Sequence, residues 1–120
     1  MRHRVNKFKN FKKKDVDHRS AMLRNLLTSF FTHKGITTTE KQAKAIVGEI
    51  DRLVNVANTK EHGAAVREIA SILYTKQAGI ELLQNVAPKF KGASSGFTRI
   101  TPIKYRDGDS AKVVKIELVK

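Results

Sequence analysis

The residues most suggestive of catalysis are the five at positions 92–96, Gly-Ala-Ser-Ser-Gly, which match the G-x-S-x-G pattern of a serine nucleophile. That chemistry requires a strand before the serine, a helix after it, and an acid and a histidine later in the chain. In this chain a helical pattern ending at Pro88 precedes the motif, a strand pattern follows it, and no histidine lies beyond His62. We therefore interpret residues 92–96 as a loop and predict that the chain is not an enzyme.

The four histidines could serve as metal ligands or as acid–base groups; they are His3, His18, His33 and His62. No two of them have the i, i+4 spacing that places two ligands on one helix face, and the chain has no cysteine. His18 and His33 fall near the two ends of one predicted helix, roughly 22 Å apart at a rise of about 1.5 Å per residue. We predict no metal site, no cofactor and no catalytic residue.

Positive charge is the strongest chemical signal in the chain, whose formal net charge is +13. Residues 1–14 contain seven Lys or Arg and no acid, and residues 89–120 contain eight Lys or Arg against three acids. Residues 61–88, in contrast, contain two against three. Cations gathered at both ends attract phosphate polymers or anionic lipid, but no apolar run is long enough to span a bilayer. We expect a nucleic acid as the partner, with no membrane and no small-molecule substrate.

This charge pattern divides the chain into a basic arm at residues 1–14 and a single globular domain at residues 15–120. The arm should be extended, because its like charges repel and only Val5, Phe8 and Phe11 are apolar. Aromatic side chains between lysines can stack on bases while the lysines contact phosphates. Phe8 and Phe11 can equally dock on the domain, and the sequence leaves these two interpretations open. The hydrophobic content of 40% is enough for one core.

Helical periodicity predicts four helices in the domain, near residues 17–33, 40–57, 63–74 and 76–87. Residues spaced to lie on the buried faces are Ala21, Met22, Leu23, Leu26, Leu27, Phe30, Phe31, Ala43, Ile46, Val47, Ile50, Leu53, Val54, Ala57, Val66, Ile69, Ala70, Leu73, Leu82, Leu83 and Val86. Gly35 is predicted to stop the first helix. Thr37 and Glu40 have the spacing of a capping box for the second helix, and Pro88 should end the fourth.

Alternating side chains predict a β-hairpin near the C-terminus, with strands at residues 97–106 and 112–119 around an Asp-Gly-Asp turn at 107–109. Residues predicted to share one face of the first strand are Phe97, Thr101, Ile103 and Tyr105, and those predicted inward on the second are Val114, Ile116 and Leu118. Pro102 indicates an edge strand or a bulge, and the β-branched run at 36–39 is a candidate third strand. The predicted fold class is α+β: a basic extended arm, four helices and a C-terminal β-hairpin.

Six segments resemble one known family in the same order: MRHR at the start, HRSAMLRNL at 18–26, TTTEKQAKAI at 37–46, APKF at 87–90, GFTRI at 96–100, and RDGDSA with IELV within 106–119. The family is the bacterial large-subunit ribosomal protein family numbered seventeen, and the resemblance covers essentially the whole chain. It implies an α+β fold that binds large-subunit ribosomal RNA near the polypeptide exit tunnel. It also implies neighbouring large-subunit ribosomal proteins as partners, a cytoplasmic location on the ribosome, and neither catalysis nor a cofactor.

The resemblance and the charge pattern together give a set of predicted RNA contacts. Those within the family's motifs are Arg2, His3, Arg4, His18, Arg19, Arg24, Asn25 and Arg99. The others, in the arm and the basic C-terminal segment or beside the first helix, are Lys7, Lys9, Lys12, Lys13, Lys14, Lys34, Lys89, Lys91, Lys104 and Arg106. Glu49 and Asp51 depart from the family's more basic second helix and argue against RNA contact by that face. The alternative function is a nucleoid-type architectural DNA-binding protein, because DNA attracts the same charges.

Deleting residues 1–14 tests the role of the arm. We expect the domain to keep nearly all of its stability, because the predicted apolar faces all begin beyond residue 20. RNA affinity should fall steeply. If about five of the arm's cations contact phosphates, the slope of log affinity against log salt should flatten by roughly 3.5–4.5. Titrating a ribosomal RNA fragment at several salt concentrations measures this slope, and an unchanged affinity and slope would assign binding to the C-terminal segment alone.

Overall fold

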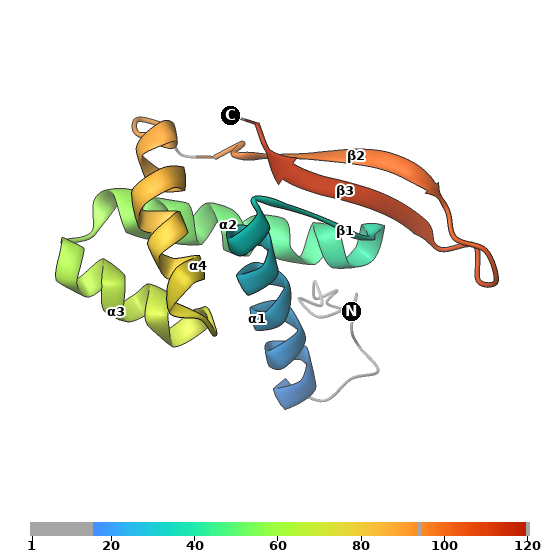
Figure 1. Cartoon of the computed structure of the whole chain (residues 1–120), viewed down its shortest axis with the longest axis horizontal. Coiled ribbons are helices and arrows are strands. Elements are labelled where there is room, and N and C mark those ends of the chain that lie inside the picture. Colours follow the sequence, from blue (N-terminus) through green and yellow to red (C-terminus); the bar gives the residue numbers. More distant parts are fainter. Residues whose placement is uncertain (1–15, 94, 120) are drawn as a thin grey trace, which may run out of the picture.

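The computed structural model describes residues 16–93 and 95–119. Outside them lie the predicted arm at 1–14, with its proposed contacts Arg2, His3, Arg4, Lys7, Lys9, Lys12, Lys13 and Lys14, and also Asp15, Ser94 and Lys120. The elements are α1 (Val16–His33), β1 (Gly35–Thr39), α2 (Glu40–Thr59), α3 (His62–Ile72), α4 (Lys76–Glu81), the π-helical η2 (Leu82–Val86), the 3-10 helix η3 (Ala87–Phe90), β2 (Thr98–Tyr105) and β3 (Lys112–Leu118). Four helices and a C-terminal hairpin (Figure 1) confirm the predicted α+β fold class.

The three strands form one antiparallel sheet in the order β1-β3-β2, so that β3 is central and the other two are edge strands (Figure 1). The strand predicted at 36–39 therefore joins the hairpin. Ile36 lies opposite Ile116, which in turn lies opposite Ile100. This row faces the helices, and Ile116 is fully buried there. The helix α2 packs against β3 and β1 and covers this face of the sheet.

The hydrophobic core is organised around α2, which packs against the sheet, α1, α3 and the segment η2–η3. Residues of α2 that have no exposed surface are Ala43, Ile46, Ile50, Leu53 and Val54. Fully buried or nearly so around them are Leu27, Phe30 and Phe31 of α1, Ile69 of α3, Leu82 and Val86 of η2, and Val114 and Ile116 of β3. Each large apolar side chain buried in this way contributes about 1.5–3 kcal/mol relative to an exposed one.

The turn between α1 and β1 differs from the prediction. The residue with left-handed backbone is Lys34, with φ of 62°, and Gly35 is the first residue of β1. Glycine is needed at this position for a different reason. A Cβ atom at Gly35 would lie 3.2 Å from the Cβ of Glu117 and 3.3 Å from the carbonyl oxygen of Ile116. The close pairing of β1 with β3, rather than the end of α1, therefore explains the glycine.

The start of α2 also differs from the predicted capping box. Because β1 continues to Thr39, Thr37 lies within the strand and α2 begins at Glu40. Thr39 occupies the N-cap position but makes no side-chain cap, while the hydroxyl of Thr38 donates to Oε1 of Gln42. The capping box of Thr37 and Glu40 was therefore wrong, because strand pairing moves the helix start beyond Thr37.

The helix predicted at 76–87 changes type along its length. It is α-helical to Glu81, and in η2 the N–H of Ala87 donates to the carbonyl of Leu82, five residues earlier. Pro88 has no N–H and its ring would clash with the carbonyl four residues before it in a regular α-helix. Here Pro88 lies near the start of η3, and helical backbone continues to Phe90. Pro88 therefore interrupts the α-helix without ending the helical segment.

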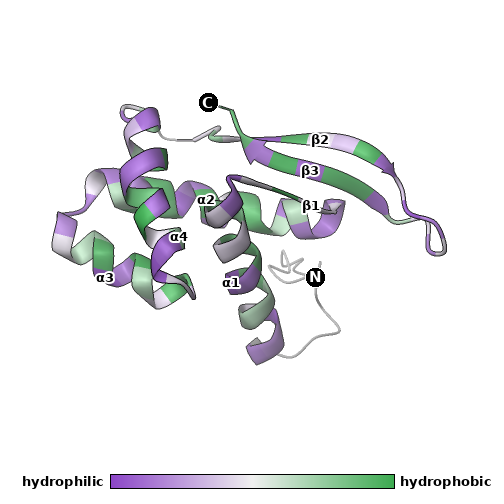
Figure 2. Cartoon of the chain, in the orientation of Figure 1, coloured by the Kyte–Doolittle hydropathy of each residue, from purple (hydrophilic) through white to green (hydrophobic). Residues whose placement is uncertain are grey.

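Four residues with apolar-face spacing are exposed. Val66 and Ala70 lie on the outer side of α3, and Ile103 and Tyr105 lie on the outer half of the hairpin. That half reaches beyond the N-terminal end of α2, so no described helix covers it (Figure 1). Hydrophobic segments are visible along α3 and along both strands of the hairpin in Figure 2. The predicted burial of Val66 and Ala70 was wrong, because no described element covers the outer side of α3. The predicted common face of the first strand was also wrong, since Phe97 is buried whereas Thr101 is exposed and lies opposite Lys115.

Replacing Leu53 with alanine tests the central position of α2. Leu53 has no exposed surface, so Leu53→Ala should lower the free energy of unfolding by about 2–5 kcal/mol. The matched control is Ile103→Ala, because Ile103 is 51% exposed and its truncation should change stability by at most about 0.5 kcal/mol. Chemical denaturation of both variants measures the difference. Equal effects of the two substitutions would contradict the described packing.

Candidate nucleic-acid interface

The face of the sheet that points away from α2 carries polar residues from all three strands. Residues directly opposite each other in antiparallel strands lie on the same face, so the register defines this face in rows. The rows are Gly35, Glu117 and Arg99; Thr37, Lys115 and Thr101; and Thr39, Val113 and Lys104. We call these residues the open sheet face. Among them only glycine and valine lack a polar side chain.

Three cations and one acid lie on the open sheet face. Arg99 and Lys104 are exposed and make no ion pair with any residue in 16–93 or 95–119. Lys115 is also exposed, and its Nζ lies 3.5 Å from Oε2 of Glu117. An exposed pair at this distance contributes at most about 1 kcal/mol, so Lys115 can exchange Glu117 for a stronger anion. Together with the hydroxyl groups of the threonines, these cations provide hydrogen-bond donors for the phosphate and sugar oxygens of a nucleic-acid backbone.

A bulge in β2 places Lys104 on this face. The register shifts between Pro102 and Lys104, so that Pro102 lies opposite Val114 and Lys104 lies opposite Val113. Simple alternation from Thr101 would have put Ile103 on the open sheet face and Lys104 on the other side. The extra residue in the bulge reverses this assignment, as bulges commonly do where a side chain is redirected. The prediction of an edge or bulge at Pro102 is confirmed on both counts.

Lys115 was not among the predicted contacts, although its position could have been found. Val114 and Ile116 were predicted inward, and both are fully buried. Since side chains alternate along a strand, Lys115 between them must point outward. Identifying Thr37 and Thr101 as its neighbours required the register across three strands, which the sequence does not specify.

Arg106 and Asp109 form an ion pair at the tip of the hairpin. The Nε of Arg106 lies 3.1 Å from Oδ1 of Asp109, and a terminal nitrogen lies 2.5 Å from Oδ2. The N–H of Ala111 also donates to Oδ1, at 3.1 Å. These hydrogen bonds lower the pKa of Asp109 to about 2, and the bond from Arg106 has the largest effect. Gly108 has φ of +95°, so the predicted turn is present, and Arg106 stabilises it.

Two other predicted contacts take part in packing between elements. The Nε of Arg24 donates to the carbonyl of Ile72 at 2.8 Å, and the guanidinium lies 4.2 Å from the ring centroid of Tyr74. Arg24 thus fastens α1 to the end of α3. The Nζ of Lys34 lies 3.5 Å from Oε2 of Glu81, at the end of α4. Both cations have roles in the fold that the sequence did not reveal.

The remaining predicted contacts lie away from the open sheet face. His18 and Arg19 are near the start of α1 and Asn25 is at its middle, whereas β1 follows the C-terminal end of that helix (Figure 1). His18 and Asn25 are exposed and Arg19 is half-buried. Lys89 belongs to η3 and Lys91 follows it, and both are exposed. The structure therefore brings together Arg99 and Lys104 but distributes the other described contacts over separate regions.

Two acidic residues of α2 interact with other groups of the protein. Oε1 of Glu40 lies 3.0 Å from Nζ of Lys44, and Oε2 lies 3.1 Å from Nζ of Lys112 on β3. Hydrogen bonds from Lys44 and Lys112 lower the pKa of Glu40. Burial raises the pKa of Asp51, against the effect of a hydrogen bond from the N–H of Phe97. Both acids therefore interact within the protein, on the side of the sheet that α2 covers.

Within residues 16–93 and 95–119, no three His, Asp or Glu side chains are grouped so that they could hold a metal ion. In the same residues, no helix has the length and apolar character needed to cross a membrane. The described part of residues 92–96 is a loop between η3 and β2, as the sequence predicted.

Comparison with known proteins finds relatives along most of the chain. The family model described as Ribosomal protein L17 matches residues 22–119. The large ribosomal subunit protein bL17 of Desulforudis audaxviator is 39% identical over 103 residues, which are 86% of this chain and 91% of that protein. The protein of the same name from Desulforamulus reducens is 40% identical over 102 residues, or 85% and 90% of the two chains. That of Geobacter sulfurreducens is 36% identical over 105 residues, 88% of this chain but only 59% of the longer relative.

The ion pair at the hairpin tip predicts a distinct titration. Asp109 should titrate with a pKa of about 2, and Arg106→Gln should move this pKa up toward the ordinary value for aspartate. Because the folded pKa is lowered, the pair stabilises the hairpin above the unfolded pKa of about 3.9 and loses this effect as pH falls through about 2. NMR titration of the Asp109 carboxyl carbon measures the midpoint. The same midpoint in both proteins would show that Arg106 does not bind Asp109 in solution.

Proposed function

The chain belongs to the ribosomal protein L17 family and is a large-ribosomal-subunit protein, and from this premise we propose that it binds large-subunit ribosomal RNA through its open sheet face and its basic arm. The observation that carries this proposal is the row-by-row register that places Arg99, Lys104 and Lys115 on one uncovered face. The role is structural: the protein holds RNA segments in place within the subunit and performs no catalysis.

The geometry of the open sheet face suits a folded RNA. Neighbouring strands lie about 4.8 Å apart, and alternate residues along a strand are about 6.8 Å apart. The face therefore presents several cations and hydroxyl groups within the span of a few nucleotides. Phosphate contacts by the cations would supply much of the affinity. Hydroxyl groups of Thr37 and Thr101 can hydrogen-bond to phosphate or to the ribose 2′-hydroxyl, which distinguishes RNA from DNA.

The predicted contacts are not equivalent in this proposal. Arg99 and Lys104 lie on the open sheet face, and Lys115 joins them. The exposed Lys89 and Lys91 and the residues at the start of α1 remain predicted contacts of other RNA segments. Arg24 and Arg106 already bind within the protein, so we expect them to act chiefly by holding α1 and the hairpin tip in position.

Location in the subunit follows from the family resemblance rather than from the geometry. We propose that the protein lies near the polypeptide exit tunnel of the cytoplasmic ribosome, beside other large-subunit proteins. The fold is compatible with this location, because the hairpin projects beyond the helical part of the molecule (Figure 1). Such a projection can reach between RNA segments that the compact helical part cannot enter.

Removing the cations of the open sheet face tests the RNA interface. The triple variant Arg99→Gln, Lys104→Gln, Lys115→Gln should flatten the slope of log affinity against log salt by about 2–2.7 if each contacts one phosphate. The matched control is Lys60→Gln, Arg67→Gln, Lys76→Gln, which removes the same charge from exposed residues outside this face. Titration of a folded ribosomal RNA fragment and of duplex DNA measures both variants. Equal losses for the two triples, or a preference for DNA, would contradict the proposal.

Tyr105 gives a second test, which is independent of charge. Its side chain is 68% exposed, between Lys104 and Arg106 on the projecting hairpin. We propose that the ring stacks on an unpaired base. Tyr105→Ala should then lower RNA affinity by about 1–3 kcal/mol while the salt slope stays unchanged. Tyr105→Phe is the matched control and should keep the affinity, because stacking needs the ring and not the hydroxyl. Full affinity in the alanine variant would exclude stacking.

A further inference from the structure

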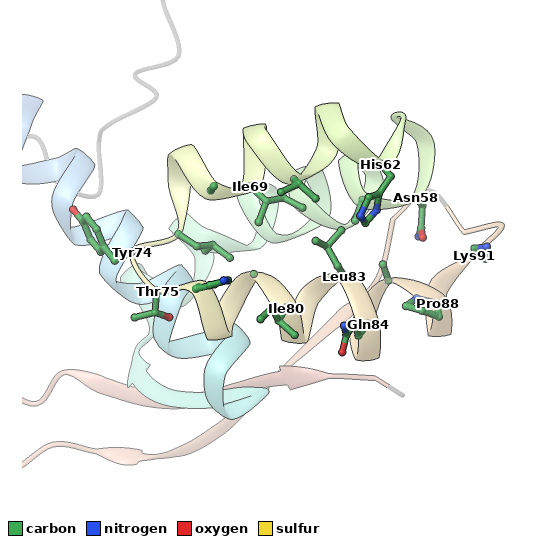
Figure 3. Close-up of a pocket in the computed structure, with 17 residues that line it drawn as sticks. Asn58, His62, Ile69, Tyr74, Thr75, Ile80, Leu83, Gln84, Pro88 and Lys91 are labelled. Atoms are coloured by element: carbon green, nitrogen blue, oxygen red, sulfur yellow. The ribbon is translucent and has the colours of Figure 1, made fainter.

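An apolar groove of about 640 Å³ lies between α3 and the segment α4–η2. Figure 3 shows it running from Tyr74 and Thr75 at one end to Asn58 and Lys91 at the other. Ile69 and Leu83 lie between these ends, on opposite sides of the groove (Figure 3). The groove is separate from the open sheet face, since none of the residues on that face lines it.

The walls of the groove are apolar side chains left uncovered by the fold. Val66 is 38% exposed and Ile80 is 41% exposed, and Ala70 is also exposed. Val66 and Ala70 belong to the apolar face of α3 that the sequence predicts to be buried. In the described part of the chain, no further element covers them. An amphipathic helix with half of its apolar face uncovered is typical of a surface to which another apolar segment binds.

A lysine lies toward each end of this groove. Lys76 lines the groove and directly follows Thr75, which lies at one end. Lys91 lies at the opposite end (Figure 3). No Asp or Glu is among the lining residues. Neither Lys76 nor Lys91 forms an ion pair with another described residue. Each end of the groove therefore carries a lysine that forms no ion pair within the described residues.

The dimensions of the groove match a helix of a few turns. The α3 wall has 11 residues, which at about 1.5 Å per residue gives roughly 16 Å, or about three helical turns. An amphipathic helix in such a groove makes contact through residues at i, i+3 or i+4, and i+7. Acidic residues at its two ends would lie near Lys76 and Lys91.

We propose that this groove binds an amphipathic helix of a partner protein that carries acidic residues at both ends. The charge of each possible occupant favours this partner over the arm of this chain and over a second copy of it. The arm of this chain has seven cations and no acid, and a second copy brings a net charge of +13, so both would be repelled by Lys76 and Lys91. RNA is disfavoured because the walls between the two lysines are apolar and would desolvate its phosphates. This inference goes beyond RNA binding and does not depend on it.

Binding of two synthetic peptides to the full-length protein tests the proposal. Both peptides have about 14 residues with leucines at helical spacing; one has two glutamates at each end and the other has two lysines there. We expect the acidic-ended peptide to bind at least about tenfold more tightly, as measured by fluorescence anisotropy. Amide NMR signals of Ala70, Ile80 and Leu83 should shift on binding. The double variant Lys76→Glu, Lys91→Glu should reverse the preference between the peptides, because it exchanges the charge at both ends of the groove.

Apolar contact is tested separately with Val66→Glu, Ile80→Glu, which should abolish binding of the acidic-ended peptide. Its control is Ile103→Glu, at an exposed apolar residue on the hairpin, and this variant should bind normally. If the groove variant fails to fold, as judged by thermal melting, the charge-exchange variant still decides the question. Equal binding of the two peptides, no binding by either, or a groove closed by self-association would each overturn the proposal.

Discussion

The packing of α2 against one face of the sheet is the constraint on which the rest of the structure depends. Ile46 and Ile50 of the helix and Val114 and Ile116 of the central strand have no exposed surface. Because side chains alternate along a strand, burying this face obliges Lys115 and its cross-strand neighbours to point outward. The cations of the open sheet face are thus positioned by the apolar residues beneath them. The core therefore lies on one face of the sheet and the cations proposed to bind RNA lie on the other.

The same central helix determines what remains uncovered. The helix α2 packs against the sheet, α1 and α3. The outer side of α3 is therefore not covered by α2, and it forms a groove with α4 and η2. The hairpin extends beyond the N-terminal end of α2, so its outer half projects with Tyr105 exposed. Glu40 at the start of α2 forms an ion pair with Lys112 at the start of β3. Two different surfaces, one basic and one apolar, follow from a single packing arrangement.

Local periodicity predicted the elements of this fold, because each buried face repeats along one segment of chain. The stripe of α2 and the alternation of β3 are read directly from the sequence. The misassigned details depend on contacts between distant segments. Gly35 is explained only by its approach to Glu117, and the exposure of Val66 only by the absence of a neighbour within the described residues. Local spacing cannot show whether an apolar face is covered.

The candidate site shows the same division. Arg99 and Lys104 were predicted from charge and resemblance, whereas their meeting on one face depends on the bulge beside Pro102. Arg24 is equally basic in the sequence, but its hydrogen bond to Ile72, distant along the chain, gives it a packing role. Charge in a sequence indicates the class of partner. Which charges remain available to that partner is decided by tertiary contacts.

The most direct test of the central claim, that the open sheet face binds ribosomal RNA, is the rate of lysine acetylation in the purified large subunit compared with the free protein. Mass spectrometry measures the extent of acetylation at Lys104 and Lys115. Lys60 is the internal reference, because it pairs with Glu68 on α3, away from the sheet. We predict that Lys104 and Lys115 are acetylated far more slowly in the subunit than in the free protein, relative to Lys60. Equal rates for Lys104 and Lys115 in the two states would show that RNA does not cover this face.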